Sequence, residues 1–447
     1  MAQTPESRSL APDSLSHRDV LMIAVPITLS NATVPLIGFV DTVVIGQLGQ
    51  AHLLGAIALS AAIFSFIYFL FNFLRMGTTG LTAQAVGADN AGEVAASLVR
   101  ALILAAIIGL VLIVLQVPIR HFALSLMGAS ERVSEIAATC IDIRIWAAPA
   151  ALANFALLGW FIGLGKATVA FGLQLFLNTI NIVLAIVFVM VFDWSVPGVA
   201  LAAVAAELVA VVAGLVIARR ELQSRHATFS VYAVTEFSQM RRVLAVSRDI
   251  LIRTACIQIA ITFFVAQGAR AGDATLATNA ILFNIVLIAI YMIDGFAYAV
   301  ETLVGQAVGA RARNRFRNAI RLSTQGAALV SVVLAIVLWL TGYMIIDFMT
   351  TSEEIRGLAR VYLVWAALVP ITSVWCFLLD GIFIGATATA TMRNMMFISM
   401  LGYFAAWFFL VPLFENHGLW IALHVLFLLR AVTLAGAMPG LEKRLFS

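Results

Sequence analysis

Asp41 is a lone carboxylate inside an apolar stretch near the start of the chain, where its sequence neighbours include Ile37, Phe39, Val40 and Val43. A charged side chain at the centre of a bilayer costs roughly 2.5–3.5 kcal/mol on insertion scales, so such residues usually carry a function. A carboxylate kept away from water also binds a proton more readily than one in solution. The position of Asp41 therefore predicts a group that takes up and releases a proton. A hydrogen bond to a neighbouring helix is the alternative.

Two prolines, Pro26 and Pro35, lie in the same apolar stretch as Asp41. Proline removes a backbone donor and can bend a helix. Because Asp41 follows Pro35 by six residues, a change in its protonation is well placed to alter the bend. We predict that the two prolines form a hinge, and a permanent kink is the alternative.

Three asparagines lie in later apolar stretches. Asn154 stands alone, whereas Asn178 and Asn181 are three residues apart and therefore lie near one face of a helix. Amides inside a membrane usually form hydrogen bonds between helices, which is the packing interpretation. In the functional interpretation, the asparagines bind Asp41 or a ligand.

The C-terminal half carries ionisable residues within its apolar stretches. Asp249 and Arg253 are four residues apart, a spacing that allows an ion pair on one helix. Asp294 and Glu301 are seven residues apart and share a helix face. Either these residues form an ion-pair network that fixes the helices, or Asp294 or Glu301 attracts a cationic ligand. The predicted network comprises Asp249, Arg253, Asp380 and Arg393, with Arg430 in the last apolar stretch.

The composition is that of a membrane protein. Of the 447 residues, 62% are hydrophobic and only 11% are charged, whereas soluble domains carry about 25% charged residues. The mean hydropathy of +1.03 is too high for a surface in contact with water. These values exclude an ordinary cytosolic enzyme, a disordered chain and a nucleic-acid binder, and they predict a multi-pass membrane protein.

Side chains for metal binding or covalent chemistry are sparse. The three cysteines, Cys140, Cys256 and Cys376, stand more than 100 residues apart in apolar runs, so we predict neither a metal site nor a disulfide. The sequence has no phosphate-binding loop. It also lacks the HExxH and GxSxG patterns of hydrolases. We therefore predict no enzymatic activity and no resident cofactor.

The apolar runs are continuous rather than alternating, so they predict helices instead of a β-barrel. A helix needs about 20 apolar residues to cross a bilayer. We predict an all-α polytopic fold with twelve membrane-spanning helices. They cover residues 20–45, 53–83, 98–118, 134–158, 167–192, 197–218, 244–268, 275–305, 320–341, 355–380, 391–413 and 417–438.

Basic residues are distributed unequally between the loops. If the N-terminus is cytoplasmic, the cytoplasmic segments contain fifteen Lys and Arg, and the opposite loops contain only Arg120, Arg132, Arg270 and Arg356. Positive charge concentrates on the cytoplasmic side of membrane proteins. Both termini are therefore predicted to be cytoplasmic. The basic run 310–321 is expected to contact anionic lipid rather than nucleic acid.

The two halves of the chain contain the same short motifs. QAVGA occurs at 84–88 and again at 306–310, and GxFIG occurs at 159–163 and again at 381–385. In each case the second copy of the motif lies 222 residues after the first, which indicates an internal duplication. Such repeats build transporters whose halves rock around a central site.

Each half holds six predicted spans, so the two halves have the same orientation in the membrane. A pseudo-two-fold axis along the membrane normal is then expected. The predicted units are an N-terminal six-helix lobe (1–218), a cytoplasmic linker (219–243) and a C-terminal six-helix lobe (244–447).

Several long stretches carry a resemblance to a known family. They are VPLIGFVDTVVIGQLG (34–49), LRMGTTGLTAQAVGA (74–88), SRDILIR (247–253), DGFAYAVETLVGQAVGA (294–310) and CFLLDGIFIGATATATMRN (376–394). On these stretches the chain resembles the multidrug and toxic compound extrusion (MATE) family and, within it, the DinF (DNA-damage-inducible F) branch. The resemblance covers nearly the whole chain.

The resemblance implies two six-helix lobes around a V-shaped cavity. It also implies export of amphipathic, often cationic compounds, driven by inward flow of protons or sodium ions, with Asp41 as the coupling residue of the N-terminal lobe. Many relatives carry a second aspartate four residues after the asparagine that matches Asn181, where this chain has Ala185. Because sodium prefers several oxygen ligands and a proton needs one carboxylate, this departure favours protons.

We therefore predict a proton-coupled antiporter that exports amphipathic or cationic drugs and toxic compounds by alternating access. It is expected to act as a monomer in the cytoplasmic (inner) membrane of a bacterium, with membrane lipids and small-molecule substrates as its partners. A sodium-coupled multidrug exporter is one alternative. A lipid-linked glycan flippase of the same superfamily is another, although flippase cavities tend to carry several cationic residues and many flippases have fourteen spans.

Overall fold

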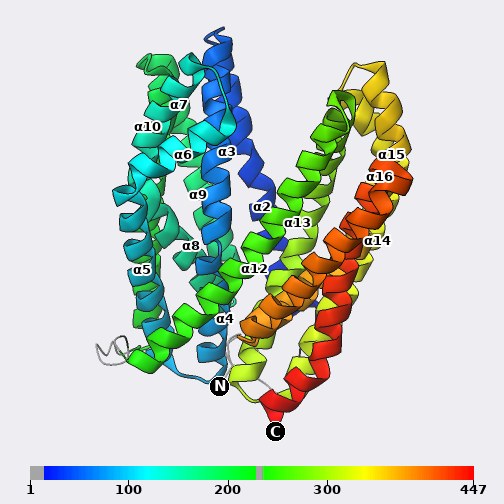
Figure 1. The fold of residues 1–447 in the computed structure, drawn as a ribbon. Coiled ribbons are helices and arrows are strands. Elements are labelled where there is room, and N and C mark those ends of the chain that lie inside the picture. The colour runs from blue at the N-terminus through cyan, green and yellow to red at the C-terminus, as the bar shows by residue number, and fades with distance from the viewer. Residues whose placement is uncertain (1–14, 228–233, 235) are drawn as a thin grey trace. The chain divides into compact units, whose positions relative to one another are not determined.

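The computed structural model describes residues 15–227, 234 and 236–447, and the regular structure of these residues is helical throughout (Figure 1). The first helices are α2 (His17–Gly46), α3 (Ala51–Phe71), α4 (Phe73–Gly87), α5 (Ala91–Val114), α6 (Gln116–Met127), α7 (Glu131–Arg144), the short η1 (Ile145–Ala147), α8 (Ala148–Gly163), α9 (Ala167–Ile186), the π-helical η2 (Val187–Val191) and α10 (Ser195–Ser224). The later helices are α12 (Phe237–Arg270), α13 (Asp273–Gly309), α14 (Arg313–Met349), α15 (Glu353–Gly385) and α16 (Thr389–Phe446).

The twelve predicted spans are confirmed in the described part of the chain. Eleven helical stretches are long and apolar enough to cross a membrane. One of them, α16, has 58 residues and breaks at Glu415, where φ is 49° and ψ is −126°. This break separates the predicted spans 391–413 and 417–438, so α16 supplies both.

Helix α6 was not predicted as a separate element. The third span was expected to continue to residue 118, but α5 ends at Val114 and a 12-residue helix follows. Pro118 lies in the first turn of α6, where its missing N–H has no helical partner to lose. Gly128, with φ of 61°, ends α6 in the left-handed conformation that glycine adopts freely.

The chain forms two compact units. The N-terminal unit comprises residues 29–244, and the C-terminal unit comprises residues 245–447 together with the described residues up to Thr28. Helix α2 is thus divided between the units, because its first half packs on α13. There the Thr28 hydroxyl donates to the carbonyl oxygen of Met292 at 3.3 Å. The lobe boundaries predicted from the sequence assign this half of α2 to the N-terminal lobe, and part of the predicted linker 219–243 lies outside the described residues.

The internal repeat appears as the same close helix contact in each unit. A Cβ atom on Gly159 of α8 would lie 2.3 Å from the Arg75 carbonyl oxygen of α4. A Cβ atom on Gly381 of α15 would lie 2.4 Å from the Ala297 carbonyl oxygen of α13. Both residues of the second contact lie 222 positions after those of the first. Small residues let membrane helices approach closely, so the GxFIG motifs are packing elements.

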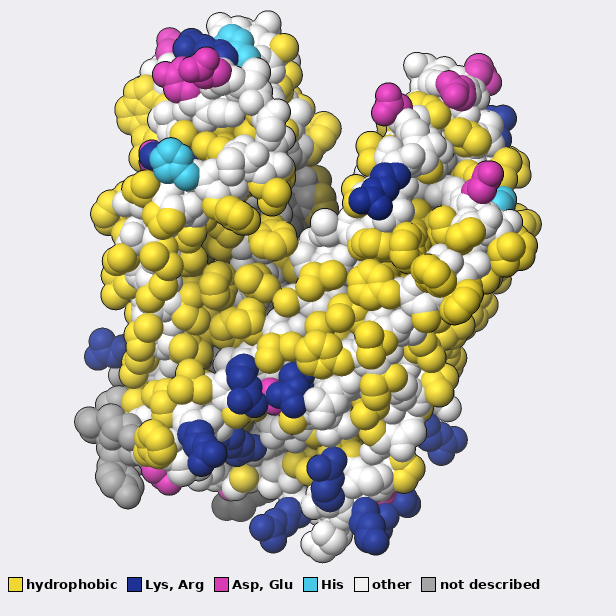
Figure 2. Space-filling view, in the orientation of Figure 1, with side chains coloured by type: hydrophobic (Ala, Val, Ile, Leu, Met, Phe, Trp, Pro, Cys, Tyr) yellow, Lys and Arg dark blue, Asp and Glu magenta, His cyan; other side chains and the backbone are white. Residues whose placement is uncertain are grey.

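Large hydrophobic side chains lie exposed on the outer faces of both units, as expected for contact with lipid acyl chains. Leu413, for example, is 72% exposed, and Phe122 is 71% exposed. Figure 2 shows hydrophobic side chains along the middle of the helices in each unit and charged side chains gathered near the helix ends. This distribution matches a bilayer in cross-section.

The repeated glycine contact leads to a matched pair of stability predictions. Gly159→Ala and Gly381→Ala should each destabilise the protein by about 1–3 kcal/mol, because the added methyl group has no space against a backbone carbonyl. Gly172→Ala and Gly436→Ala are the controls, since nothing lies within 4 Å of a Cβ atom at either position. Thermal unfolding in detergent measures the effect. Equal melting temperatures for all four variants would contradict the close contact.

Candidate functional site

Asp41 lies in the part of α2 that belongs to the N-terminal unit. Its side chain is half-buried, and its Oδ1 atom is fully buried with no hydrogen-bond partner among the described residues. One turn further on, Val44 and Ile45 join an apolar cluster with residues of α3, α7 and α10. Because a buried acceptor without a donor is costly, this carboxyl oxygen favours the binding of a proton or another cation.

Arg144, at the end of α7, is the basic residue whose charge acts on Asp41. Its guanidinium lies over the ring of Phe64 on α3, 4.5 Å from the ring centre. One turn earlier on α7, Cys140 accepts a hydrogen bond from Ser60 at 3.1 Å and is reached by the charges of both Asp41 and Arg144. Arg144 is not among the site residues predicted from the sequence, although it is a basic residue inside the predicted span 134–158.

Asn154 binds a carboxylate, but the partner is Glu207 rather than Asp41. The Asn154 amide on α8 donates to Glu207 Oε2 at 2.6 Å and to the Glu207 carbonyl oxygen at 3.1 Å. Glu207 lies in the middle of α10, and Arg144 also acts on its charge. Glu207 is also absent from the site residues predicted from the sequence, although, like Asp41, it is a carboxylate within an apolar stretch.

Asn178 connects α9 to α2. Its amide donates to the Thr33 hydroxyl at 2.8 Å and accepts from the Gln174 amide at 2.8 Å. Asn181 is buried, and its Oδ1 atom has no hydrogen-bond partner in the described part of the chain. Asp41 and Asn181 thus each present one unsatisfied buried oxygen, on helices that Asn178 joins.

The two predicted hinge prolines fall on opposite sides of the division between the units. Pro26 lies in the part of α2 that packs in the C-terminal unit, and Pro35 lies in the part that packs in the N-terminal unit. Helix α2 continues through both prolines from His17 to Gly46. Bending at either proline would therefore act on a helix that contributes to both units.

The four predicted network residues of the C-terminal unit belong to two ion-pair clusters centred on the buried carboxylates of Asp380 and Asp249. Asp380 of α15 pairs with Arg253 of α12 and, at 2.5 Å, with Arg430 of α16. Asp249 of α12 pairs with Arg393 at 2.6 Å and accepts a second bond from Arg248 at 3.0 Å. Asp249 and Arg253, which could have paired along one helix, therefore bind residues on other helices. All four predicted network residues take part in ion pairs.

Asp294 and Glu301 occupy different environments on α13. Glu301 is 1% exposed and lies where α13 and α15 touch, with its carbonyl oxygen 2.3 Å from the position of a Cβ atom on Gly385. Asp294 is half-buried and acts on Tyr291, three residues earlier. Of these two acidic residues, Asp294 is thus the more exposed.

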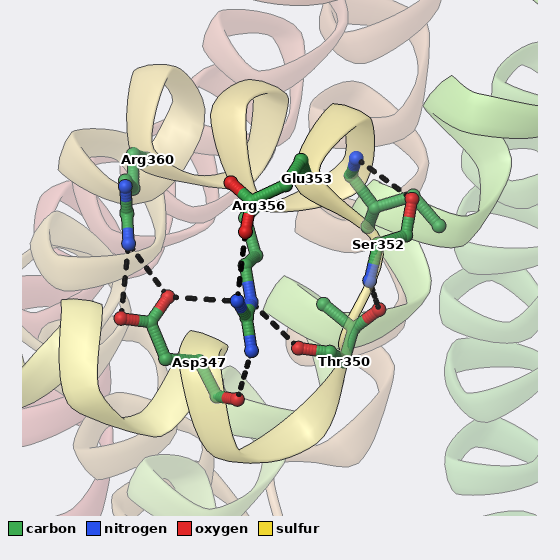
Figure 3. Close-up of polar contacts among 7 residues, drawn as sticks. Asp347, Thr350, Ser352, Glu353, Arg356 and Arg360 are labelled. Carbon is green, nitrogen blue, oxygen red and sulfur yellow. Dashed lines mark hydrogen bonds and ion pairs between the residues drawn. The ribbon is translucent and has the colours of Figure 1, made fainter.

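An exposed ion-pair cluster closes the turn between α14 and α15 (Figure 3). Arg360 binds both carboxylate oxygens of Asp347, at 2.7 and 2.9 Å. Arg356 donates to the carbonyl oxygens of Thr350 and Asp347. These contacts link the end of one helix to the start of the next, and none of the predicted site residues takes part.

A cavity of about 450 Å³ lies within the N-terminal unit and is separate from the predicted site. His52, Arg132, Thr139 and Asp193 are among its lining residues. None of the predicted site residues lines this cavity. The cavity is therefore not evidence for a functional role of Asp41.

A family model described as MatE matches residues 26–187 and 251–406. The chain belongs to the MatE family. The two matched ranges fall one in each half of the duplicated sequence. The resemblance found from the sequence motifs is thereby confirmed.

Two relatives from bacteria illustrate the similarity. The DNA damage-inducible protein F of Escherichia coli (strain K12) is 41% identical over 420 residues, which cover 94% of this chain and 91% of that protein. The probable multidrug resistance protein YoeA of Bacillus subtilis (strain 168) is 24% identical over 412 residues, covering 88% of this chain and 85% of that protein. The predicted similarity to the DinF branch is confirmed by the first relative.

Solved structures show the same fold. A MATE transporter crystallised in the bent conformation superposes with a TM-score of 0.89 at 19% identity, covering 100% of both chains. The outward-facing conformation of a multidrug resistance MATE family transporter superposes with a TM-score of 0.86 at 20% identity, covering 99% of this chain and 100% of that one. The protein is thus an all-α, multi-pass membrane protein of a family whose members transport small molecules.

Proposed function

We propose that the protein is a proton-coupled antiporter that exports amphipathic or cationic compounds from the cytoplasm by alternating access. Asp41 is the residue that carries the coupling. The observation that supports this role is its buried Oδ1 atom, which has no hydrogen-bond partner among the described residues. A proton on this oxygen supplies the missing donor, so proton binding and release change the local energy of α2.

Protons rather than sodium ions fit the residues around Asp41. Sodium is held best by several oxygen ligands, and the position where many relatives carry a second aspartate is the buried Ala185. The amide of Asn154 is already bound to Glu207. Sodium coupling remains the second candidate because Asn181 Oδ1 has no hydrogen-bond partner among the described residues.

A ligand shifts an equilibrium between two conformations only through different affinities for them. The proton meets this requirement if Asp41 is exposed to water in one state and buried in the other. Because α2 contributes to both compact units, a proton-dependent bend near Pro35 or Pro26 reaches both. We propose that these prolines are the hinge of the transport cycle.

The remaining properties follow from charge and from the relatives. We propose a location in the bacterial cytoplasmic membrane with both termini cytoplasmic, since basic residues concentrate on that side. The basic segment that begins α14 is suited to anionic lipid head groups, and the exporter is expected to act as a monomer. A transporter role without enzymatic activity agrees with the transporter relatives.

Proteoliposomes with imposed gradients test the proposal. With tetraphenylphosphonium as the transported probe, an imposed proton gradient should drive uptake against its concentration gradient, and an equal sodium gradient should not. If the sodium gradient drives uptake and the proton gradient does not, sodium rather than the proton is the coupling ion. Translocation of a fluorescent lipid-linked glycan, without gradient-driven cation flux, would instead identify a flippase.

A further inference from the structure

The C-terminal unit presents two arginines from different helices around one buried carboxylate. Arg248 of α12 donates to Asp249 Oδ1 from Nε at 3.2 Å and from Nη2 at 3.0 Å. Arg393 of α16 donates to the same oxygen at 2.6 Å. We call Arg248 and Arg393 the arginine pair. The Asp249 side chain is only 4% exposed, whereas those of Arg248 and Arg393 are 62% and 22% exposed, so the carboxylate holds the pair from the protein side.

The arginine pair carries one positive charge more than its counter-charge neutralises. Among the described residues, Asp249 is the only carboxylate that forms an ion pair with either arginine. It is also the only acidic residue of α12, and α16 has no acidic residue before Glu415. The next cluster along α12 adds no negative charge, because its one carboxylate, Asp380, is shared by Arg253 and Arg430. A surplus of one positive charge therefore remains at the arginine pair.

Helix α12 and the first half of α16 lie side by side and run in the same direction. The Asp249–Arg393 ion pair joins them near their starts, and further along the Tyr403 hydroxyl donates to the Ala260 carbonyl oxygen at 3.3 Å. Between these two contacts the chain advances 11 residues on α12 and 10 residues on α16, so the helices are parallel. The arginine pair thus lies at one end of both helices, which is the end predicted to be cytoplasmic.

Exposed apolar side chains follow the arginine pair along both helices. On α16, Phe397 and Leu401 follow Arg393 at intervals of four residues and are 42% and 67% exposed. On α12, Ile259 follows Arg248 by 11 residues and is 52% exposed. Residues at these spacings share a helix face, and 11 residues span about 16 Å, which is close to the depth of one leaflet, about 15 Å. The surface therefore has the order of a phospholipid, a charged end followed by an apolar stretch.

We propose that the arginine pair binds the phosphodiester of one anionic phospholipid, whose acyl chains lie along α12 and α16. Arginine presents its donors in a planar fork that matches phosphate oxygens, and Arg248 Nη1 forms no hydrogen bond among the described residues. A phosphodiester carries one negative charge, which equals the surplus at the arginine pair. Basic pockets between membrane helices on the cytoplasmic side are suited to such head groups. Lipid binding here is independent of the proposed transport function and goes beyond it.

Titration of the full-length protein in detergent with phosphatidylglycerol tests the inference, and native mass spectrometry counts the lipids that stay bound. The unaltered protein should bind phosphatidylglycerol more tightly than phosphatidylethanolamine with the same acyl chains, which has the phosphodiester but no net charge. Arg248→Gln should weaken phosphatidylglycerol binding about fivefold, since one basic residue contributes about 1 kcal/mol to the attraction of anionic lipid.

Three variants make this test specific. Arg248→Gln should fold, because Asp249 keeps its ion pair with Arg393. Arg248→Lys keeps the charge and should bind phosphatidylglycerol nearly as well as the unaltered protein. Arg360→Gln is the matched control and should leave binding unchanged. Arg360 is 41% exposed, but its cluster balances two arginines with two carboxylates.

A phosphatidylglycerol with a photoreactive group on an acyl chain locates the bound lipid. Crosslinks should fall on the segments 252–259 of α12 and 397–401 of α16. Inorganic phosphate in large excess should not displace the lipid, because the acyl chains contribute to its binding. Displacement by inorganic phosphate without these crosslinks would reveal a site for free anions and overturn the proposal.

Two further results would also overturn the role of the arginine pair. The first is equal affinity of the unaltered protein for phosphatidylglycerol and phosphatidylethanolamine. The second is the same phosphatidylglycerol affinity in Arg248→Gln and Arg360→Gln.

Discussion

Asp380→Asn is expected to destabilise the C-terminal unit by about 3–5 kcal/mol, because it leaves two buried guanidinium groups without their shared counter-charge. Asp380 is 5% exposed, and its partners Arg253 and Arg430 are 7% and 3% exposed. The three residues lie on α12, α15 and α16, so the loss would loosen three helices together. Thermal unfolding in detergent or chemical denaturation in lipid measures the effect.

Asp347→Asn is the matched control for this prediction (Figure 3). Asp347 also binds two arginines, Arg356 and Arg360, but it is 40% exposed. Water can solvate all three charges, and exposed ion pairs contribute at most about 1 kcal/mol. A similar loss of stability in both variants would show that burial of the Asp380 cluster is not the decisive factor.

Asp41→Asn is expected to abolish proton-driven transport while leaving the protein folded. Asparagine has nearly the shape of aspartate but cannot exchange a proton. The imposed proton gradient can therefore no longer change the conformation of α2 through this residue. Because Asp41 Oδ1 has no hydrogen-bond partner among the described residues, the substitution leaves no donor unpaired at this atom. Gradient-driven flux in proteoliposomes should fall to the level of empty liposomes.

Asp89→Asn controls for the same chemical change outside the membrane. Asp89 is exposed in the turn between α4 and α5, with φ of 51°, a conformation that asparagine also tolerates. This variant should transport like the unaltered protein. Proton-driven flux that survives in Asp41→Asn would remove Asp41 from the coupling mechanism, provided the variant is present in the membrane at a normal level.

The two aspartate variants show how little residue type alone reveals. Asp41 and Asp380 are both carboxylates within predicted spans. The first has an unsatisfied oxygen, whereas the second is bound by two arginines from other helices. The same substitution should therefore affect transport in one case and stability in the other. Only the neighbours on adjacent helices separate these outcomes.

The partners of the predicted polar residues show the limit of sequence reasoning. For Asn154 the sequence left open a hydrogen bond to a neighbouring helix or a bond to Asp41 or a ligand, and the structure shows a bond to Glu207 of α10, which lies 53 residues later in the chain. Arg253 could pair with Asp249 one turn away, but it binds Asp380, which lies 127 residues later. Spacing along one helix identifies which residues share a face, and it does not reveal which helix that face meets.

The sequence by itself determined the membrane environment, the twelve spans, the duplication and the family, and it singled out Asp41 as the predicted coupling residue. These properties depend on composition, on the length of apolar runs and on local motifs, because the bilayer requires each span to be apolar and helical. Only the tertiary structure decided the division of α2 between two units, the close glycine contacts and the binding of Asn154 to Glu207. These depend on the rotation and packing of helices that are distant in sequence, where a few ångströms decide whether two charges meet.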